Sequence, residues 1–237
     1  MTDIVQQVDG SLHADVLNKG HVVLEATMGS DLTIVNNARV SFDQESTDMG
    51  EAEEGLLNFL MRERHGSPWE SVVFRFDVKA PIFVMREWAR HRISSTNEQS
   101  ARYSVIPSDF YVPERDQVRK QVGKPGSYSF NRIEDDAVAD GVRIALEAQQ
   151  QAAYATYESL LMAGVAKEVA RIVLPVGMFS RMKWTVNLRA LFNFLSLRND
   201  QHAQWEIREY ARAIEKMVKM KVPVAMACFE KHGRQTP

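Results

Sequence analysis

Residues 72–103 read VVFRFDVKAPIFVMREWARHRISSTNEQSARY, and the rest of the chain can be placed around this stretch. Its first half is mostly apolar and must be largely buried. Its second half, residues 90–103, contains only two apolar residues, Ile93 and Ala101, among many ionisable and hydrogen-bonding side chains. A polar run that directly follows a buried one must emerge from the core at an edge or in a cleft. Such a placement favours a functional site over a linker.

The apolar half predicts a strand followed by a helix. Apolar side chains at positions 74, 76 and 78 alternate with Arg75 and Asp77, which is typical of a half-buried strand. Pro81 can occupy the first turn of a helix, where its missing N–H costs nothing. We expect that helix to run to about residue 92.

Apolar spacing and turn residues predict the remaining elements. Residues 106–137 contain three prolines and few apolar residues, so we interpret them as a long excursion with at most one short helix. Helices alternate with a few strands along the rest of the chain. We expect further strands over residues 21–26 and 179–186, and helices starting near residues 32, 51, 136, 166, 187 and 201.

Composition limits the class of protein. The 237 residues suffice for one full-sized domain, and 45% hydrophobic with 25% charged residues is ordinary globular usage. A net charge of -2 excludes a uniformly basic surface, so we expect no nucleic-acid partner. Neither a signal peptide nor an apolar run of about 18 residues occurs, which predicts a cytoplasmic protein that does not enter a membrane. The single cysteine, Cys228, is interpreted as a buried apolar residue.

The polar half could bind an anion. Guanidinium groups suit phosphate, and hydroxyl and amide groups supply further hydrogen bonds. The alternative is that Arg90 and Arg92 only complement the end of a helix. The number of polar groups that follow favours the anion site, whose members would be Arg90, His91, Arg92, Asn97, Gln99, Ser100 and Arg102.

Two more arginines, Arg171 and Arg198, stand in largely apolar sequence. A guanidinium there needs an acidic partner or an anionic ligand, and a structural ion pair is as good an interpretation as a site. His202 and Glu206 alone do not make a metal site, so we predict no metal. Nucleophile-elbow and dinucleotide-fingerprint motifs are also missing. The residues by themselves therefore indicate an enzyme or binding protein for a small phosphorylated ligand.

The chain resembles a known family in these same residues. Arg90-His91-Arg92, seven further residues and then Ser100 match the Arg-His-Arg-x7-Ser signature of the flavin-dependent thymidylate synthases. Residues 65–70, 170–175 and 184–205 also look like that family. The resemblance covers about residues 20–230 and is weakest over residues 106–137.

The resemblance implies an α+β fold, a twisted sheet flanked by helices, in one catalytic domain over residues 1–237 with a variable excursion at about 106–137. It implies an enzyme that methylates dUMP to dTMP, with 5,10-methylenetetrahydrofolate as carbon donor and FAD reduced by NADPH as hydride source. It also implies a homotetramer whose active sites are shared between subunits. The family uses no enzyme cysteine as nucleophile.

Individual roles follow from the same resemblance. Arg198 would be the catalytic residue, a fixed cation that activates the uracil ring. FAD would be bound by His65, Ser67, Arg90, His91, Arg92, Glu98, Asn187, Arg189 and Asn193. The substrate dUMP would be bound by Glu87, Arg90, Glu98, Gln99, Ser100, Ala101, Arg102, Arg171 and Arg198.

Two other functions remain open at this point. A non-catalytic nucleotide-binding or nucleic-acid-binding protein could use the same arginines for phosphates. A flavin enzyme with another pyrimidine substrate could use the same site. Flavin absorbance, and then an assay for dTMP, would separate the three.

Overall fold

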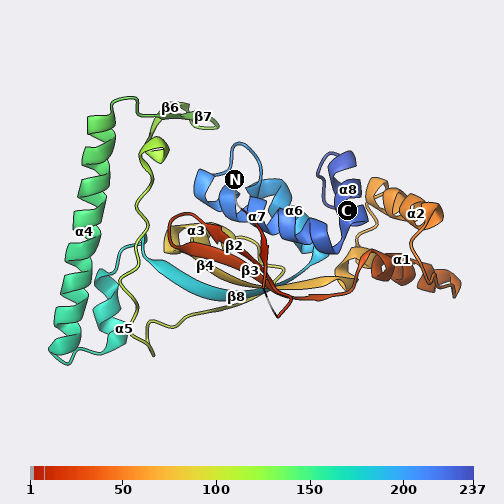
Figure 1. Cartoon of the computed structure of the whole chain (residues 1–237), viewed down its shortest axis with the longest axis horizontal. Coiled ribbons are helices and arrows are strands. Elements are labelled where there is room, and N and C mark those ends of the chain that lie inside the picture. Colours follow the sequence, from red (N-terminus) through yellow and green to blue (C-terminus); the bar gives the residue numbers. More distant parts are fainter. Residues whose placement is uncertain (1–2, 8) are drawn as a thin grey trace. The chain divides into compact units, whose positions relative to one another are not determined.

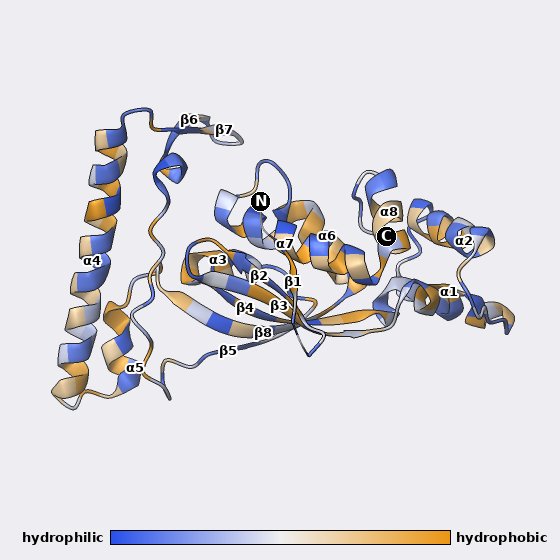
Figure 2. Ribbon diagram, in the orientation of Figure 1, coloured by the Kyte–Doolittle hydropathy of each residue, from blue (hydrophilic) through white to orange (hydrophobic). Residues whose placement is uncertain are grey.

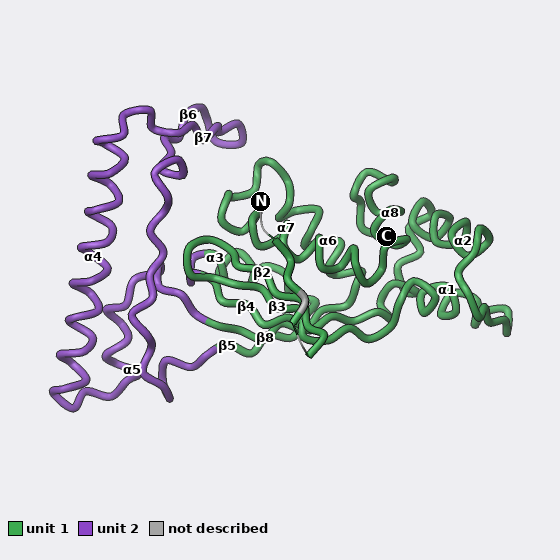
Figure 3. The backbone as a smooth tube through the Cα atoms, in the orientation of Figure 1, with its two compact units in different colours: residues 1–80, 84–98, 181–237 green, residues 81–83, 99–180 purple. Residues whose placement is uncertain are grey.

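The computed structural model describes residues 3–7 and 9–237, whose contacts form two compact units. Unit 1 comprises residues 1–80, 84–98 and 181–237, and unit 2 comprises residues 81–83 and 99–180 (Figure 3). Compactness alone does not show that a unit folds independently, so one catalytic domain remains a prediction.

In the described part of the chain, unit 1 is built on a six-stranded sheet. Residue 81, which ends one strand, and residues 179–180, which begin another, belong to unit 2. Neighbouring strands β1–β2, β2–β3, β3–β4 and β5–β8 pair antiparallel. In spatial order the strands are β1 (Val5–Gln6), β2 (Leu12–Val16), β3 (Gly20–Met28), β4 (Val73–Pro81), β8 (Phe179–Asn187) and β5 (Ser95–Glu98).

Strand β4 has the alternation that its sequence predicts. Phe74 and Phe76 are fully buried, whereas Arg75 between them is exposed. Phe76 lies opposite Leu24 of β3, so the apolar positions of neighbouring strands share one face. Asp77 points to the other face, where it is nevertheless buried by charged neighbours.

The apolar face is covered by helices. In Figure 1, α6 (Leu188–Arg198) and α7 (Trp205–Lys221) lie over the sheet, and hydrophobic residues recur along α6 and the strands in Figure 2. Tyr210 of α7 fixes this packing, because its hydroxyl donates to the Lys79 carbonyl of β4 over 2.7 Å. The other helices of unit 1 are α1 (Asp31–Arg39), α2 (Glu51–Arg62), α3 (Ile82–Trp88, whose first two residues belong to unit 2) and α8 (Pro223–Lys231), with short 3-10 turns at Val40–Phe42 and Ser67–Ser71.

Helix α3 is shorter than predicted. It ends at Trp88 rather than near residue 92, and Pro81 closes β4 instead of occupying the first turn of the helix. The chain turns after Trp88, with a hydrogen bond from His91 N to the Trp88 carbonyl of 2.9 Å. It must turn there because residue 95 already begins β5, which pairs with β8. The Arg-His-Arg motif therefore lies in a turn.

Unit 2 is dominated by the long helix α4 (Asp136–Met162), which starts where the sequence predicts. Asp135 caps its N-terminus by accepting from the Ala137 and Val138 amides, and Gly164 follows its end with a φ of 82°. The excursion before α4 contains a two-stranded hairpin that the sequence did not indicate. The other elements of unit 2 are β6 (Arg119–Lys124), β7 (Ser127–Arg132), α5 (Lys167–Ala170) and 3-10 turns at Arg115–Gln117 and Arg171–Val173.

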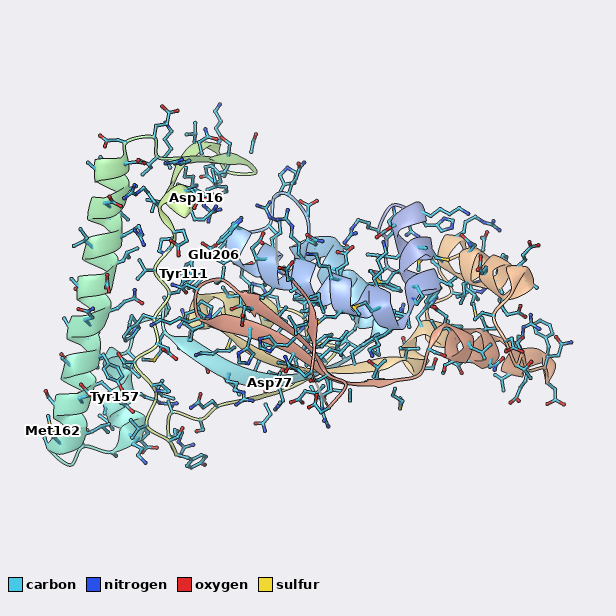
Figure 4. The ribbon with its side chains drawn as sticks, viewed as in Figure 1. Asp77, Tyr111, Asp116, Tyr157, Met162 and Glu206 are labelled. Carbon is cyan, nitrogen blue, oxygen red and sulfur yellow. The ribbon has the colours of Figure 1, made fainter. Side chains whose placement is uncertain are left out.

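The segment that enters the excursion is bound to α4. Tyr154 donates to the Ile106 carbonyl over 2.9 Å, and Tyr157 accepts from the Ile106 amide over 3.4 Å. Figure 4 places Tyr157 on the side of α4 that faces this segment. Ile106, Phe110 and Met178 form a small apolar cluster beside these tyrosines. The start of the excursion is therefore part of a packed unit.

Candidate active site

Unit 1 contains a cavity of about 400 Å³ at the N-terminal end of α6. This volume is in the range of pockets that hold small molecules. Its walls come from the turn after α3, the end of β8, the start of α6 and the last described residues. The lining residues are Glu70, Arg90, His91, Arg92, Ile93, Val186, Asn187, Arg189, Ala190, Asn193 and Thr236.

The start of α6 gives this cavity a positive wall. Asn187 caps the helix, since its side-chain oxygen accepts from the Ala190 amide over 2.9 Å. Arg189 and Asn193 are four residues apart, so both project from one face of the helix into the cavity. The partial positive charge of the helix N-terminus adds to that of Arg189 and favours an anion.

Arg189 is held by two oxygen atoms. Its Nη1 donates to Glu70 Oε1 over 2.7 Å, and its Nε donates to the Pro237 carbonyl over 2.9 Å. The pair with Glu70 is about half exposed and adds little to stability. Its effect is to orient the guanidinium at the edge of the cavity.

Arg90 and Arg92 have no acidic partner among the described residues. Both are exposed, and neither side chain makes a hydrogen bond or ion pair there. Like charges that lie so close repel each other unless an anion lies between them. These two residues therefore supply free cationic donors to the cavity.

His91, between these two arginines, points inward. Its Nε2 accepts from Arg198 Nε over 2.9 Å, and its ring packs edge-on against Phe194 with 4.9 Å between centroids. Burial, and then the charge of Arg198, lower the pKa of His91 to about 4. Because Nε2 accepts, Nδ1 carries the proton, and this buried N–H has no partner among the described residues. It is a donor that the fold leaves without an acceptor.

Arg198, at the end of α6, is also bound to α3. Its Nη1 donates to Glu87 Oε2 over 2.9 Å, and its Nη2 donates to the Glu87 carbonyl over 3.1 Å. The acidic partner expected for this partly buried cation is thus present. Burial raises the pKa of Glu87. The charge of Arg198 acts to lower this pKa, and the charge of Glu206 acts to raise it further.

Other predicted substrate residues lie in a turn of unit 2. The Ser100 carbonyl accepts from the Tyr103 and Ser104 amides, and its hydroxyl accepts from the Arg102 amide over 3.3 Å. Arg102 also pairs with Glu168 over 3.2 Å, with both side chains about half exposed. The turn therefore presents a hydroxyl and a guanidinium that a ligand could reach.

The structure gathers part of the predicted flavin site. Of the nine residues predicted for FAD, Arg90, His91, Arg92, Asn187, Arg189 and Asn193 line the cavity. His65, Ser67 and Glu98 lie in unit 1 but do not line it. The predicted substrate residues are divided: Glu87, Arg90, Glu98 and Arg198 lie in unit 1, and Gln99, Ser100, Ala101, Arg102 and Arg171 lie in unit 2.

Arg171 differs from its predicted environment. Its neighbours in sequence are apolar, but the structure exposes its side chain and shows no partner for it within residues 3–7 and 9–237. Two polar lining residues, Glu70 and Thr236, had no predicted role. Glu70 ends the family-like segment 65–70 and could have been found there, whereas nothing in the sequence points to Thr236.

Other chemistry is not indicated by the described residues. They contain no group of three or more His, Cys, Asp or Glu side chains that could hold a metal ion. None of their helices is both long and apolar enough to cross a bilayer. Cys228 is buried as predicted, and burial raises its pKa to about 11, which keeps the thiol protonated.

Comparison with known proteins identifies the class. The family described as thymidylate synthase complementing protein matches residues 22–224. The flavin-dependent thymidylate synthase of Thermus thermophilus is 47% identical over 226 residues, which cover 95% of this chain and 81% of the relative. That of Thermotoga neapolitana is 46% identical over 218 residues, or 92% and 94% of the two chains.

A solved structure agrees with these relatives. The UMP/dUMP methylase PolB from Streptomyces cacaoi, bound with 5-Br dUMP, superposes with a TM-score of 0.86 at 38% identity, covering 94% of this chain and all of the other. Sequence and fold thus define an enzyme of the thymidylate synthase class. The chain belongs to the flavin-dependent thymidylate synthase family. The predicted family, α+β fold and enzymatic function are confirmed.

Proposed function

We propose that this chain methylates dUMP at C5 to give dTMP, with FAD as its flavin, 5,10-methylenetetrahydrofolate as carbon donor and NADPH as reductant. The observation that carries the proposal is the cavity of unit 1, lined by the arginines of the family signature and by the start of α6.

The cavity suits the diphosphate of FAD. Arg90 and Arg92 are cations without a partner among the described residues, and the N-terminus of α6 adds further donors. The buried Nδ1–H of His91 can donate to an acceptor atom of the ligand. Reduced FAD supplies the hydride for the reaction.

Arg198 suits the activation of the uracil ring. Its remaining N–H groups would stabilise negative charge on the uracil, which makes C5 a better nucleophile. C5 would then gain the one-carbon unit as the bonds of that carbon to the folate nitrogens break, with tetrahydrofolate leaving. C5 would lose its proton, and a hydride from the reduced flavin would complete the methyl group. We assign Gln99, Ser100, Ala101, Arg102 and Arg171 to hold dUMP, as the family resemblance implies; the related PolB is bound with 5-Br dUMP.

A homotetramer with shared active sites is the assembly that we propose. In unit 2, α4 carries exposed apolar side chains at Val138, Val142, Ile144 and Leu146, which is typical of a surface covered by another subunit. Sedimentation of the purified protein at the mass of four chains would support this assembly, and a monomer would contradict it. The cytoplasm, which holds the proposed nucleotide and folate substrates, is the proposed location.

The direct test is an assay of dTMP with purified protein, dUMP, methylenetetrahydrofolate, NADPH and FAD. We expect flavin absorbance, NADPH oxidation that depends on dUMP, and dTMP that disappears when dUMP, the folate or NADPH is omitted or when the flavin has been removed from the protein. Formation of dTMP without flavin would contradict the proposal. The non-catalytic alternative loses its support once the family is known, because the relatives are enzymes.

UMP is a second candidate substrate, since the neighbour PolB is described as a UMP/dUMP methylase. The relatives of higher identity are thymidylate synthases, so we expect dUMP to be preferred. Competition between the two nucleotides at equal concentration measures this preference directly.

A further inference from the structure

We infer that residues 233–237 form a fixed wall of the cavity in unit 1 and position Arg189 for the diphosphate of the flavin. The inference rests on the proposed function for the identity of the ligand. The match to the family ends at residue 224, so it assigns no role to this segment.

The chain turns sharply after α8. Gly233 and Arg234 both have a left-handed backbone, with φ of 73° and 58°. The Arg234 amide donates to the Phe229 carbonyl over 2.8 Å and the Gly233 amide to the Glu230 carbonyl over 3.2 Å, which is the Schellman arrangement of a helix end. Glycine takes this conformation without strain, whereas an arginine needs compensating contacts. The turn leads the chain to the cavity.

The side chain of Arg234 supplies those contacts. Its two terminal nitrogens donate to the two carboxylate oxygens of Glu215, each over 2.7 Å, and its Cζ lies 5.0 Å from the centre of the Phe229 ring. Asn199 donates to the same carboxylate. Burial acts to raise the pKa of Glu215, but the hydrogen bonds from Arg234 and Asn199 outweigh it and lower that pKa. An ionised Glu215 thus anchors the start of the segment.

The middle of the segment lies between two hollows. Thr236 lines the cavity of the candidate site and also a second cavity of about 640 Å³. An empty space provides no atoms to pack against, so packing on these two sides cannot fix the position of Thr236. The contacts at the two ends of the segment must do so. Arg64 adds one more by donating to the side chain of Gln235.

The end of the segment meets Arg189. Pro237 is buried, and its carbonyl accepts from Arg189 Nε over 2.9 Å, whereas Glu70 accepts from Nη1 over 2.7 Å in a pair that is about half exposed. The buried contact is the more constraining of the two. A neutral carbonyl also orients the guanidinium without offsetting its charge. Three of its five N–H groups have no acceptor among Pro237 and Glu70, and their direction is set before an anion arrives.

The test releases the segment with Arg234→Ala. We expect the dissociation constant of FAD, from fluorescence titration, to rise about fivefold or more, because a charged donor loses its orientation. A chain truncated after Gln235, which lacks the Pro237 carbonyl, should show a loss of similar size. Arg212→Ala, which removes an ion pair with Glu209 on α7, is the matched control and should bind FAD as wild type does. The thermal midpoint shows whether each variant is folded, and the truncated chain replaces Arg234→Ala if that variant is not.

Replacing Arg189 by lysine separates positioning from a general loosening of the cavity. Lysine keeps the charge but has no Nε–H for the Pro237 carbonyl. If the segment acts through Arg189, Arg234→Ala should change the affinity for FAD by less than about twofold in the Arg189→Lys protein. An equal loss in both backgrounds would overturn the inference, as would an unchanged affinity in Arg234→Ala alone. Tighter binding in Arg234→Ala would also overturn it, because the segment would then block the cavity.

Inorganic pyrophosphate, measured by calorimetry, makes the test independent of the reaction. If the wild-type protein forms no dTMP, the proposed function fails, but pyrophosphate should still bind, and about fivefold more weakly to Arg234→Ala. Wild-type protein that binds pyrophosphate no more tightly than Arg234→Ala does would contradict the inference alone.

Discussion

Gly66 and Arg189 pack so closely that a methyl group on Gly66 would lie 2.4 Å from Arg189 Nε and 2.5 Å from its Cζ. Only glycine leaves room for the guanidinium at the edge of the cavity. The family-like segment 65–70 thus contributes to the site because Gly66, which has no side chain, leaves space for Arg189. His65 and Ser67 of the same segment do not line the cavity.

Gly66→Ala should therefore displace Arg189. We expect flavin binding to weaken by about tenfold to a hundredfold, the effect of one lost charged hydrogen bond. The end of an arginine side chain can move, so the thermal midpoint should change little. Fluorescence titration with FAD measures the affinity. Gly55→Ala in α2 is the matched control, because its added methyl group meets nothing within 4 Å. Equal effects of the two variants would contradict the role of Gly66.

Arg198→Ala should keep the flavin and lose the reaction. We expect dTMP formation to fall by about two orders of magnitude, because a charge at the uracil edge is lost. Arg62→Ala, which removes an exposed pair with Glu63, should behave as wild type. Full activity of Arg198→Ala would remove its assigned role, and loss of bound flavin would place Arg198 at the cofactor instead.

His91 should make stability depend on pH. The folded protein keeps it neutral, with a pKa of about 4, whereas the unfolded chain takes up a proton near the ordinary value of 6.5. Between these values the unfolded state binds more protons, so stability falls as pH falls from about 6.5 towards 4. In His91→Gln, whose amide oxygen can still accept from Arg198, the thermal midpoint should fall less between pH 7 and pH 5. Equal losses in both proteins would contradict this prediction.

Asp77 should contribute to the stability of the sheet in unit 1. Its buried carboxylate accepts from Arg181 Nε over 2.8 Å and from Lys183 Nζ over 2.8 Å, and these hydrogen bonds hold its pKa at about 2 despite burial (Figure 4 shows its position). Asp77→Ala leaves two cations that can turn to water, so we expect a loss of about 1–3 kcal/mol in urea unfolding at pH 7. Asp15→Ala is the control, because that carboxylate is 89% exposed and pairs with His13.

The low pKa also gives this prediction a pH dependence. The carboxylate form is favoured in the folded state, so its contribution is complete above the ordinary pKa of 3.8 and is lost as pH falls towards 2. The difference in stability between wild type and Asp77→Ala should therefore be constant from pH 5 to pH 7. A difference that shrinks within that range would show that another group is responsible.

Local signals in the sequence predicted much of the fold. Asp135, Gly164 and Asn187 are the capping residues of α4 and α6, and a strong apolar period lies between such caps. Strands that form only because they pair with another strand were not predicted. The residues of β5 are all exposed, so they carry no alternation, and only β8 beside them makes them a strand. The β6–β7 hairpin is exposed along almost its whole length and escaped prediction for the same reason.

The candidate site likewise has residues that local sequence predicts and contacts that only the tertiary structure shows. The signature at positions 90–100 identified the family, and the structure places its arginines at a cavity. The partner of Arg198 could not be predicted, because Glu87 is 111 residues away in the sequence and nearer candidates were available to it. Contacts of this kind depend on how α3 and α6 cross, which no local pattern encodes.

The position of Thr236 and Pro237 also affects how the protein should be produced. Thr236 lines the cavity and the Pro237 carbonyl binds Arg189, so anything joined after Pro237 starts beside the proposed cofactor. An affinity tag fused there would compete for the same guanidinium, whereas a tag at the other end of the chain offers a comparison. A purified sample that lacks colour is therefore meaningful only after the tag has been moved or removed.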